Sequence, residues 1–149
     1  MRRRELIAAG GLALLAGPAS ASAQRSDSAV LIKLVAREEA AAEAYGAGKG
    51  VVVENLYSDE LAHAEALRTQ LDALGRRPAP RGLDAPARRL MEAEGDARLE
   101  AAIALEQSLV DDYAAALIDI ADPGVLQTVA TILASHAQHL ARLRAGQLP

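Results

Sequence analysis

Residues 59–70 read DELAHAEALRTQ, and they indicate the fold because they place two polar side chains on the buried face of a helix. The apolar residues in and around this stretch recur every three or four positions, the spacing of an amphipathic helix: Leu56, Tyr57, Ala64, Leu67, Leu71 and Leu74. Glu60 and His63 fall on that same face. A carboxylate removed from water costs several kcal/mol unless it has a partner. The stretch therefore predicts a helix packed in an interior that supplies a partner for Glu60.

The composition favours a helical protein and excludes several functions. The chain has 149 residues, enough for one domain, and its 51% apolar content comes mainly from Ala, Leu, Val and Ile, of which Ala and Leu favour helices. A net charge of −4 argues against nucleic acid as a partner. Because the chain has no cysteine, it forms no disulfide and has no thiolate nucleophile or zinc–thiolate site.

The first residues are typical of an export signal. Three arginines at positions 2–4 precede an apolar run over residues 6–16, which is too short to span a bilayer, and small residues follow at 21–23. The paired arginines resemble a twin-arginine signal, with an ordinary secretory signal as the alternative. We therefore predict that residues 1–23 are cleaved and that residues 24–149 form a periplasmic or secreted domain without stable membrane insertion.

The spacing of apolar residues predicts four long helices after a polar lead over residues 24–28. The helices cover about residues 30–45, 51–74, 97–120 and 123–144. Apolar residues at helical spacing within each segment should form the core.

The breaks between these helices also have characteristic sequences. Three glycines within residues 46–50 predict a tight turn, and Gly75 is expected just beyond the second helix. Residues 75–86 are rich in proline and glycine and should be a loop, followed by a short helical piece that ends near Gly95. Asp122 before a proline is typical of an N-cap. The sequence thus predicts an all-α fold, a four-helix bundle with a long crossover connection between its second and third helices.

Each predicted helix carries polar residues in the middle of its apolar face, and all three histidines of the chain are among them. Glutamates of the first and third helices, together with a pair spaced three apart on each of the other two, form a metal-site layout. Carboxylate and imidazole ligands suit iron, manganese or zinc. We therefore predict a site for one or two metal ions with these ligands: Glu38, Glu60, His63, Glu106, His136 and His139.

These residues resemble the ferritin-like superfamily of di-metal carboxylate bundles. Residues 59–64 and 71–78 are similar to the second helix of bacterioferritins. The spacing of Glu38 to Tyr45 and of Glu106 to Tyr113 is similar to both half-repeats of that family, and the likeness covers about residues 29–144. The resemblance implies a non-haem iron or manganese centre that oxidises ferrous iron or consumes peroxide. Whether the chain is such an enzyme is left open, and a homodimer is compatible with the sequence.

The chain departs from the family's pattern at one position. The second Glu-x-x-His of the family is His136-Ala-Gln-His139 here, so a histidine stands where the family has a bridging carboxylate. Glu38, Glu60 and Glu106 alone leave two divalent ions with one positive charge in excess. A mononuclear or asymmetric site is therefore considered beside a dinuclear one. The alternative function is a metal-free or mononuclear helical domain of the cell envelope with a structural, interaction or stress-protection role.

Simpler explanations exist for the individual polar residues. Glu38 or Glu106 could pair with an arginine of a neighbouring helix. Glu39 or Glu43 could be the interior residue of the first helix if its phase differs by one. The three tyrosines, at positions 45, 57 and 113, are expected in the core, where a ligand carboxylate is one of the partners open to their hydroxyls.

Overall fold

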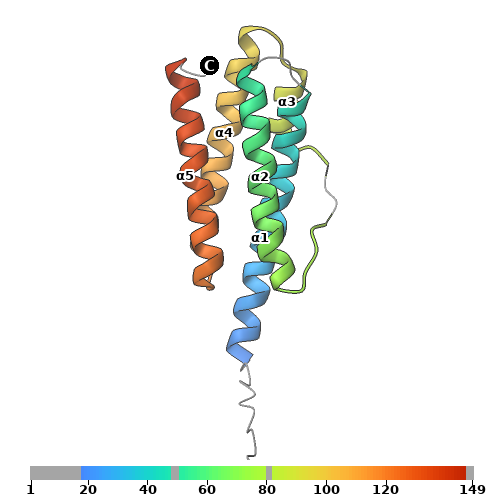
Figure 1. The fold of residues 1–149 in the computed structure, drawn as a ribbon, viewed down its shortest axis with the longest axis vertical. Helices are drawn as coiled ribbons and strands as arrows, with labels where there is room; N and C mark the ends of the chain where they lie inside the picture. The colour runs from blue at the N-terminus through green and yellow to red at the C-terminus, as the bar shows by residue number, and fades with distance from the viewer. Residues whose placement is uncertain (1–17, 48–50, 80–81, 147–149) are drawn as a thin grey trace, which may run out of the picture.

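The computed structural model describes residues 18–47, 51–79 and 82–146, and this part of the chain is all-helical (Figure 1). It contains no strand and five helices: α1 (Pro18–Gly46), α2 (Val51–Ala73), α3 (Ala85–Glu92), α4 (Asp96–Ala116) and α5 (Pro123–Ala145). The predicted all-α fold class is confirmed. The predicted export signal falls mostly on residues 1–17, which lie outside the described residues, and its boundary after residue 23 stays a prediction.

The four long helices α1, α2, α4 and α5 lie side by side, and α3 lies near one end (Figure 1). Helix α2 runs antiparallel to α1, and α5 runs antiparallel to α4. The chain leaves α2 at the lower end of the view and returns along the helices to α3, which lies in the upper half of the view. Helices α2 and α4 therefore run in the same direction. This arrangement brings the middle of all four long helices to one level.

The sequence predicted most helix ends correctly, because local caps define them. Gly75 has φ +67° just beyond α2, and Gly95 has φ +55° just before α4, and both values are in the left-handed region that favours glycine. Asp122 caps α5 by accepting hydrogen bonds from the backbone N–H groups of Gly124 (2.8 Å) and Val125 (3.0 Å). The short helical piece before Gly95 is α3.

Two predicted boundaries are wrong. Residues 24–28 are not a separate polar lead but part of α1, and Asp27 is buried there. Its carboxylate accepts hydrogen bonds from the backbone N–H groups of Ala121 (2.8 Å) and Asp122 (3.0 Å), in the turn before α5. Helix α4 ends at Ala116 instead of Ile120, because residues 117–119 tighten into a turn that meets the start of α1.

Two residues predicted on buried faces are instead exposed. Tyr57 is 39% exposed, and its ring lies over Gly46, so close that a Cβ added there would be 3.0 Å from a ring carbon. Leu99 is 45% exposed, near the start of α4, where it borders a cavity. Each lies near a helix end, where fewer neighbours are available to cover an apolar side chain.

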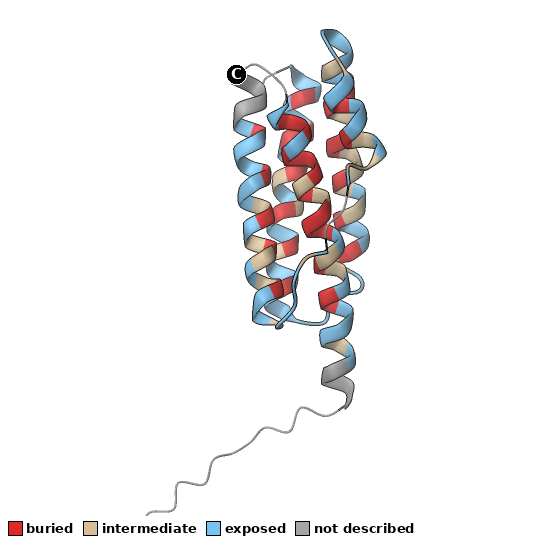
Figure 2. Cartoon of the chain, turned by 90° about the vertical axis from the view of Figure 1, so that its right-hand side faces the viewer, coloured by how far each residue is buried: buried red, intermediate tan, exposed pale blue. Residues whose placement is uncertain are grey.

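The buried residues form stripes on the inward sides of the long helices (Figure 2). Leucines and alanines dominate this core, and α1 contributes five buried alanines: Ala36, Ala40, Ala41, Ala42 and Ala44. Helix α1 contacts α2, α3 and α4, and these small side chains let its neighbours approach closely. Among the helices of the described residues, none has the length and apolar character needed to cross a membrane.

Candidate metal centre

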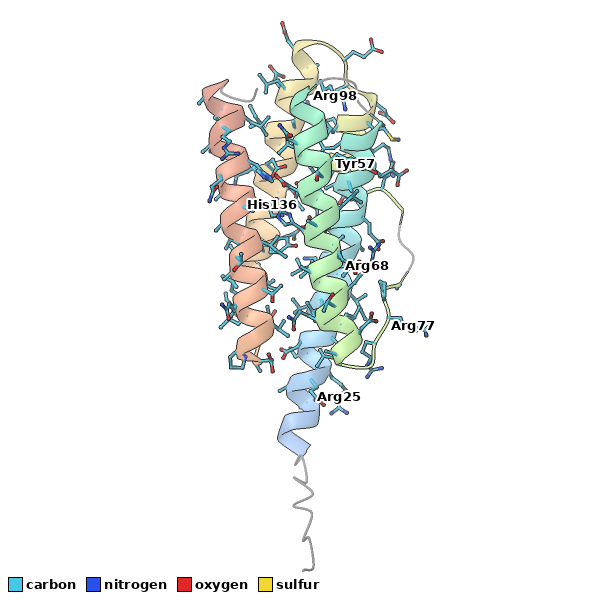
Figure 3. All side chains as sticks on the ribbon, in the orientation of Figure 1. Arg25, Tyr57, Arg68, Arg77, Arg98 and His136 are labelled. Carbon is cyan, nitrogen blue, oxygen red and sulfur yellow. The ribbon has the colours of Figure 1, made fainter. Side chains whose placement is uncertain are left out.

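All six predicted ligands meet between the four long helices. Helix α1 supplies one glutamate, α2 a glutamate and a histidine, α4 one glutamate and α5 two histidines. Figure 3 shows His136 projecting from α5 toward the middle of the packed helices. Five of the six residues are buried, and the side chain of His63 is only 12% exposed. The helical spacing in the sequence therefore identified the interior residues of all four helices: Glu38, Glu60, His63, Glu106, His136 and His139.

The six residues form two groups that could each hold a metal ion. The first group is Glu38, Glu60, His63 and His136, and the second is Glu60, Glu106, His136 and His139. Within each group, one ligand atom per residue lies within 4.8 Å of the others. Two residues, Glu60 and His136, belong to both groups.

In the first group, the ligand atoms have the spacing of atoms around a common ion. His63 Nδ1 lies 3.4 Å from Glu60 Oε2 and 3.5 Å from Glu38 Oε2. Atoms bound tetrahedrally at the usual zinc–nitrogen and zinc–oxygen distances are about 3.3 Å apart. His136 completes the group, with its Nε2 atom 3.1 Å from Glu38 Oε1.

The second group is built in the same way on the other side of Glu60. His139 Nδ1 lies 3.6 Å from Glu60 Oε1 and 3.6 Å from Glu106 Oε2. His136 Nδ1 lies 3.0 Å from Glu106 Oε2 and 3.8 Å from Glu60 Oε1. The second group therefore uses the other oxygen of Glu60 and the other nitrogen of His136.

Unpaired polar atoms show that these residues fit a metal ion. In the described part of the chain, seven buried side-chain nitrogen or oxygen atoms have no hydrogen-bond partner, and five of them lie here. The five are Glu38 Oε2, both carboxylate oxygens of Glu60, His63 Nδ1 and His139 Nδ1. Leaving buried polar groups unpaired is costly, whereas two cations, one in each group, would satisfy all five atoms. Two carboxylates and two imidazoles per group suit iron, manganese or zinc.

Two tyrosines hold the carboxylates in place through a reciprocal pair of hydrogen bonds. Tyr45 on α1 donates to Glu106 Oε1 on α4 (2.7 Å), and Tyr113 on α4 donates to Glu38 Oε1 on α1 (2.5 Å). Both tyrosines are fully buried. Each stands seven residues after the glutamate of its own helix, so the repeated spacing in the sequence becomes a crossed pair in space. Such contacts fix the direction in which a ligand carboxylate points.

Asp59 is a member of the site that the sequence did not identify. Its Oδ2 atom lies 3.1 Å from Nε2 of His139, the nitrogen that faces away from the two ligand groups. A hydrogen bond from Nε2–H to this carboxylate leaves Nδ1 of His139 free to bind a metal ion. The side chain of Asp59 is 51% exposed, so helical periodicity assigns it to the surface. Only its contact across to α5 reveals its role.

The charges of the site balance one another without a metal ion. Burial lowers the pKa of His136, but its hydrogen bonds with Glu106 and Glu38 outweigh burial and raise it to about 11. Burial likewise lowers the pKa of His63 and of His139, and nearby carboxylates outweigh it and raise each to about 9. Protonated histidines thus compensate the buried carboxylates, and a metal ion would have to displace these protons.

Burial and the neighbouring residues of the site also shift the pKa values of the three glutamates. Burial raises the pKa of Glu106, but contacts with His136 and His139 outweigh burial and lower it to about 2. The pKa of Glu38 is also lowered, because contacts with Glu60 and His136 outweigh burial. Burial and the charge of Glu38 raise the pKa of Glu60 to about 7. Glu60 therefore carries the least stable charge of the three when no metal ion is bound.

The simpler explanations for the polar residues do not hold in the described structure. Glu39 is half-buried and forms an ion pair with Arg68 (2.6 Å), and Glu43 is exposed, so the interior residue of α1 is Glu38. Arg37, the neighbouring arginine on α1, pairs with Asp84 and Asp112 instead of a site glutamate. Within the described residues, no arginine forms an ion pair with Glu38 or Glu106.

An apolar cavity of about 210 Å³ adjoins the site near the start of α4. Leu56, Leu99 and Leu143 line it together with Tyr45, whose hydroxyl donates to Glu106. One buried side chain therefore contacts both the cavity and the second group of ligands.

Fold and site together define an all-helical protein with a buried cluster of carboxylates and imidazoles that could hold metal ions. The family model described as "Ferritin-like domain" matches residues 19–147, and the chain belongs to this family. No curated protein and no solved structure matches the chain. The predicted membership in the ferritin-like superfamily is confirmed.

Proposed function

We propose that the chain is an exported ferritin-like protein that binds iron or manganese between its helices. The proposed ligands are the six clustered residues, Glu38, Glu60, His63, Glu106, His136 and His139. The observation that carries this proposal is the convergence of five unpaired buried ligand atoms on two four-residue groups. Membership in the ferritin-like family supports it independently.

The fold that we assign is the four-helix bundle with a long crossover. Helices α1 and α2 form one antiparallel pair, and α4 and α5 form the other (Figure 1). The chain between α2 and α4, which includes α3, returns along the length of the helices and would be the crossover. Helix α3 contributes buried Ala87 and Leu90 to the core. In this assignment each pair of long helices supplies one half of the ligands.

The proposed reaction is oxidation of ferrous iron or consumption of peroxide. Iron or manganese, when bound, would supply Lewis acidity and the electrons that reduce oxygen or peroxide. The chain's own residues exclude water, since five of the six ligands are buried. Tyr45 and Tyr113 hold the carboxylates of Glu106 and Glu38 by donating to one oxygen of each. Asp59 holds His139 with Nδ1 directed toward the ligands.

One observation favours a second function, that of a helical envelope domain that works without a metal ion or with one ion. His136 makes hydrogen-bond contacts with Glu106 (3.0 Å) and Glu38 (3.1 Å), so a protonated His136 can donate to one oxygen of each carboxylate without any ion. In this state the site would be a set of buried ion pairs. Such a domain would have a structural, interaction or stress-protection role.

Metal analysis of protein purified without a metal-affinity tag separates the two functions. We expect bound iron or manganese. The midpoint temperature of unfolding, followed by circular dichroism, should rise when Mn²⁺ is added to the metal-free chain. A ligand at a hundredfold excess over its dissociation constant stabilises the native state by about 2.7 kcal/mol. Glu60→Gln should abolish the shift, whereas Glu65→Gln, an exposed glutamate of α2, should retain it. An unchanged midpoint at millimolar Mn²⁺ and Fe²⁺ would refute the metal centre.

A further inference from the structure

Glu60 and His136 each present their two donor atoms to different neighbours. Glu60 Oε2 lies 3.4 Å from His63 Nδ1, whereas its Oε1 lies 3.6 Å from His139 Nδ1. His136 repeats this division, because its Nε2 lies 3.1 Å from Glu38 and its Nδ1 lies 3.0 Å from Glu106. These are the two residues that both ligand groups share. A carboxylate that faces two ligand groups is an ordinary bridge, and the imidazole here has the same placement.

We propose that His136 is a bridging ligand that binds two metal ions at once, Nε2 to the ion held by Glu38 and His63 and Nδ1 to the ion held by Glu106 and His139. This inference rests on the proposed metal centre and specifies its arrangement. The two ions would share Glu60 as a carboxylate bridge and His136 as an imidazole bridge. Each ion would then have two carboxylate and two imidazole ligands.

Charge counting is consistent with this bridge. An imidazole that binds through both ring nitrogens has lost both ring protons and carries one negative charge. Together with Glu38, Glu60 and Glu106, it gives the four negative charges that neutralise two divalent ions. The charge excess expected from the sequence for two ions therefore disappears when His136 binds in this way. A histidine bound through one nitrogen would leave that excess in a buried site.

The bridge would also set the separation of the ions. The lone pairs on the two nitrogens of an imidazole ring point away from each other, whereas a carboxylate can direct both oxygens toward close neighbours. An imidazole bridge therefore holds two ions farther apart than the about 3.5–4 Å common in two-metal sites. The centre would favour two separately coordinated ions over ions joined by one small ligand.

Mn²⁺ binding to the metal-free full chain tests the bridge through two measurements that do not depend on activity. Equilibrium dialysis counts the ions, and electron paramagnetic resonance reports whether they are magnetically coupled. We expect two Mn²⁺ per chain with a spectrum of a weakly coupled pair. Loss of one ligand should lower the affinity for the ion that it binds by roughly tenfold or more. Even the loss of a residue that only hydrogen-bonds to a ligand lowers metal affinity by about 10–100-fold.

The decisive comparison is between a variant of His136, which belongs to both groups, and a variant of His63, which belongs to one. His136→Gln should weaken the binding of both ions and abolish their magnetic coupling, because His136 belongs to both groups. His63→Gln, the matched control, should weaken the binding of one ion only. The other ion should stay bound in the group of Glu106 and His139 and give the spectrum of isolated Mn²⁺. His136→Glu should keep two ions and increase their coupling, because a carboxylate bridge brings them closer. The spectrum of the unsubstituted chain tests the bridge even where His136→Gln fails to fold.

The outcomes distinguish this inference from the proposed function. One Mn²⁺ per chain, two uncoupled Mn²⁺ ions, or unchanged binding in His136→Gln would overturn the bridge and leave the metal-binding function in place. Binding of no Mn²⁺ at all would overturn both.

Discussion

The contact between Asp59 and His139 joins the surface of the molecule to its buried cluster. Asp59 is half-exposed on α2, and its carboxylate meets the outward nitrogen of His139 on α5. A carboxylate in this position fixes the tautomer of the histidine and increases its strength as a ligand. Because Asp59 is not itself among the ligands, its removal should change affinity without removing a ligand.

Asp59→Ala is therefore expected to weaken Mn²⁺ binding by roughly tenfold or more while leaving the unfolding free energy of the metal-free chain within about 1 kcal/mol of its original value. Isothermal titration calorimetry and urea denaturation measure the two quantities. Asp72→Ala, an exposed aspartate on the same helix, is the control and should change neither. Equal affinities in the two variants would show that Asp59 has no part in the site.

The buried polar residues could be predicted at the residue scale because a charged residue on an apolar helix face is conspicuous. Glu38 and Glu106 interrupt stripes of leucine and alanine, and both are buried as expected. Asp59 could not be predicted, because its role depends on a side chain 80 residues away on another helix. His136 is the position at which the sequence departs from the family's pattern, and the structure places it in both groups.

At the scale of helices, Asp27 connects the N-terminal half of α1 to the turn before α5. Its buried carboxylate accepts hydrogen bonds from the backbone N–H groups of Ala121 and Asp122, which precede the first turn of α5. Helix α5 carries His136 and His139, so this connection helps to fix the position of two proposed ligands along the molecule.

Asp27→Ala should lower the unfolding free energy of the metal-free chain by about 1–2 kcal/mol, because two backbone N–H groups lose a charged acceptor. Urea denaturation followed by circular dichroism measures the loss. Glu43→Ala, which removes an exposed carboxylate from the same helix, serves as the control and should cost less than about 0.5 kcal/mol. If the two variants unfold alike, the Asp27 contact does not stabilise the fold.

Helix ends could be predicted where a local cap defines them and not where a distant element does. Gly75, Gly95 and Asp122 act on the nearest turn, and each lies where the sequence placed it. Residues 24–28 looked like a polar lead because Asp27 and its neighbours are hydrophilic. Their helical conformation depends on a contact with a turn that lies 94 and 95 residues farther along the chain, which no local pattern reveals.

At the scale of the whole molecule, proton binding and metal binding should oppose each other. His63 and His139 have pKa values raised from 6.5 to about 9, because the nearby carboxylates outweigh burial. Their stabilisation of the metal-free chain is fully present below pH 6.5 and is lost as the pH rises toward 9. The pKa of Glu60 is raised from 4.5 to about 7, so its contribution to the stability of the metal-free chain is also lost as the pH rises between these two values. Metal ions, in contrast, bind better once the histidines lose their protons.

The thermal midpoint of the metal-free chain is therefore expected to fall by roughly 5 °C or more between pH 6.5 and pH 8.5. With Mn²⁺ at a fixed concentration, the stabilisation relative to the metal-free chain should increase over the same range. Circular dichroism melts with EDTA and with Mn²⁺ measure both trends. A metal-free midpoint that rises with pH would contradict the assigned ion pairs.

The export prediction also belongs to the whole molecule, since it determines which residues form the mature protein. Helix α1 begins at Pro18, and its first turns extend beyond the other helices in Figure 1. Ser26 contacts the turn before α5, where its hydroxyl donates to the Asp119 carbonyl (3.0 Å). Cleavage after Ala23 would keep this hydrogen bond and those of Asp27, so the mature domain should remain folded.

Expression of the full chain in a bacterial host should therefore yield an exported protein whose intact mass corresponds to a start at Gln24. Replacing Arg3 and Arg4 together by lysine keeps the positive charge and removes the paired arginines, so export should stop if the signal is of the twin-arginine type. An ordinary secretory signal depends on charge and on the apolar run, and would still export the variant. Cell fractionation followed by mass spectrometry distinguishes these outcomes. Retention of the uncleaved chain in the cytoplasm would contradict the predicted signal, and the metal centre would then have to work inside the cell.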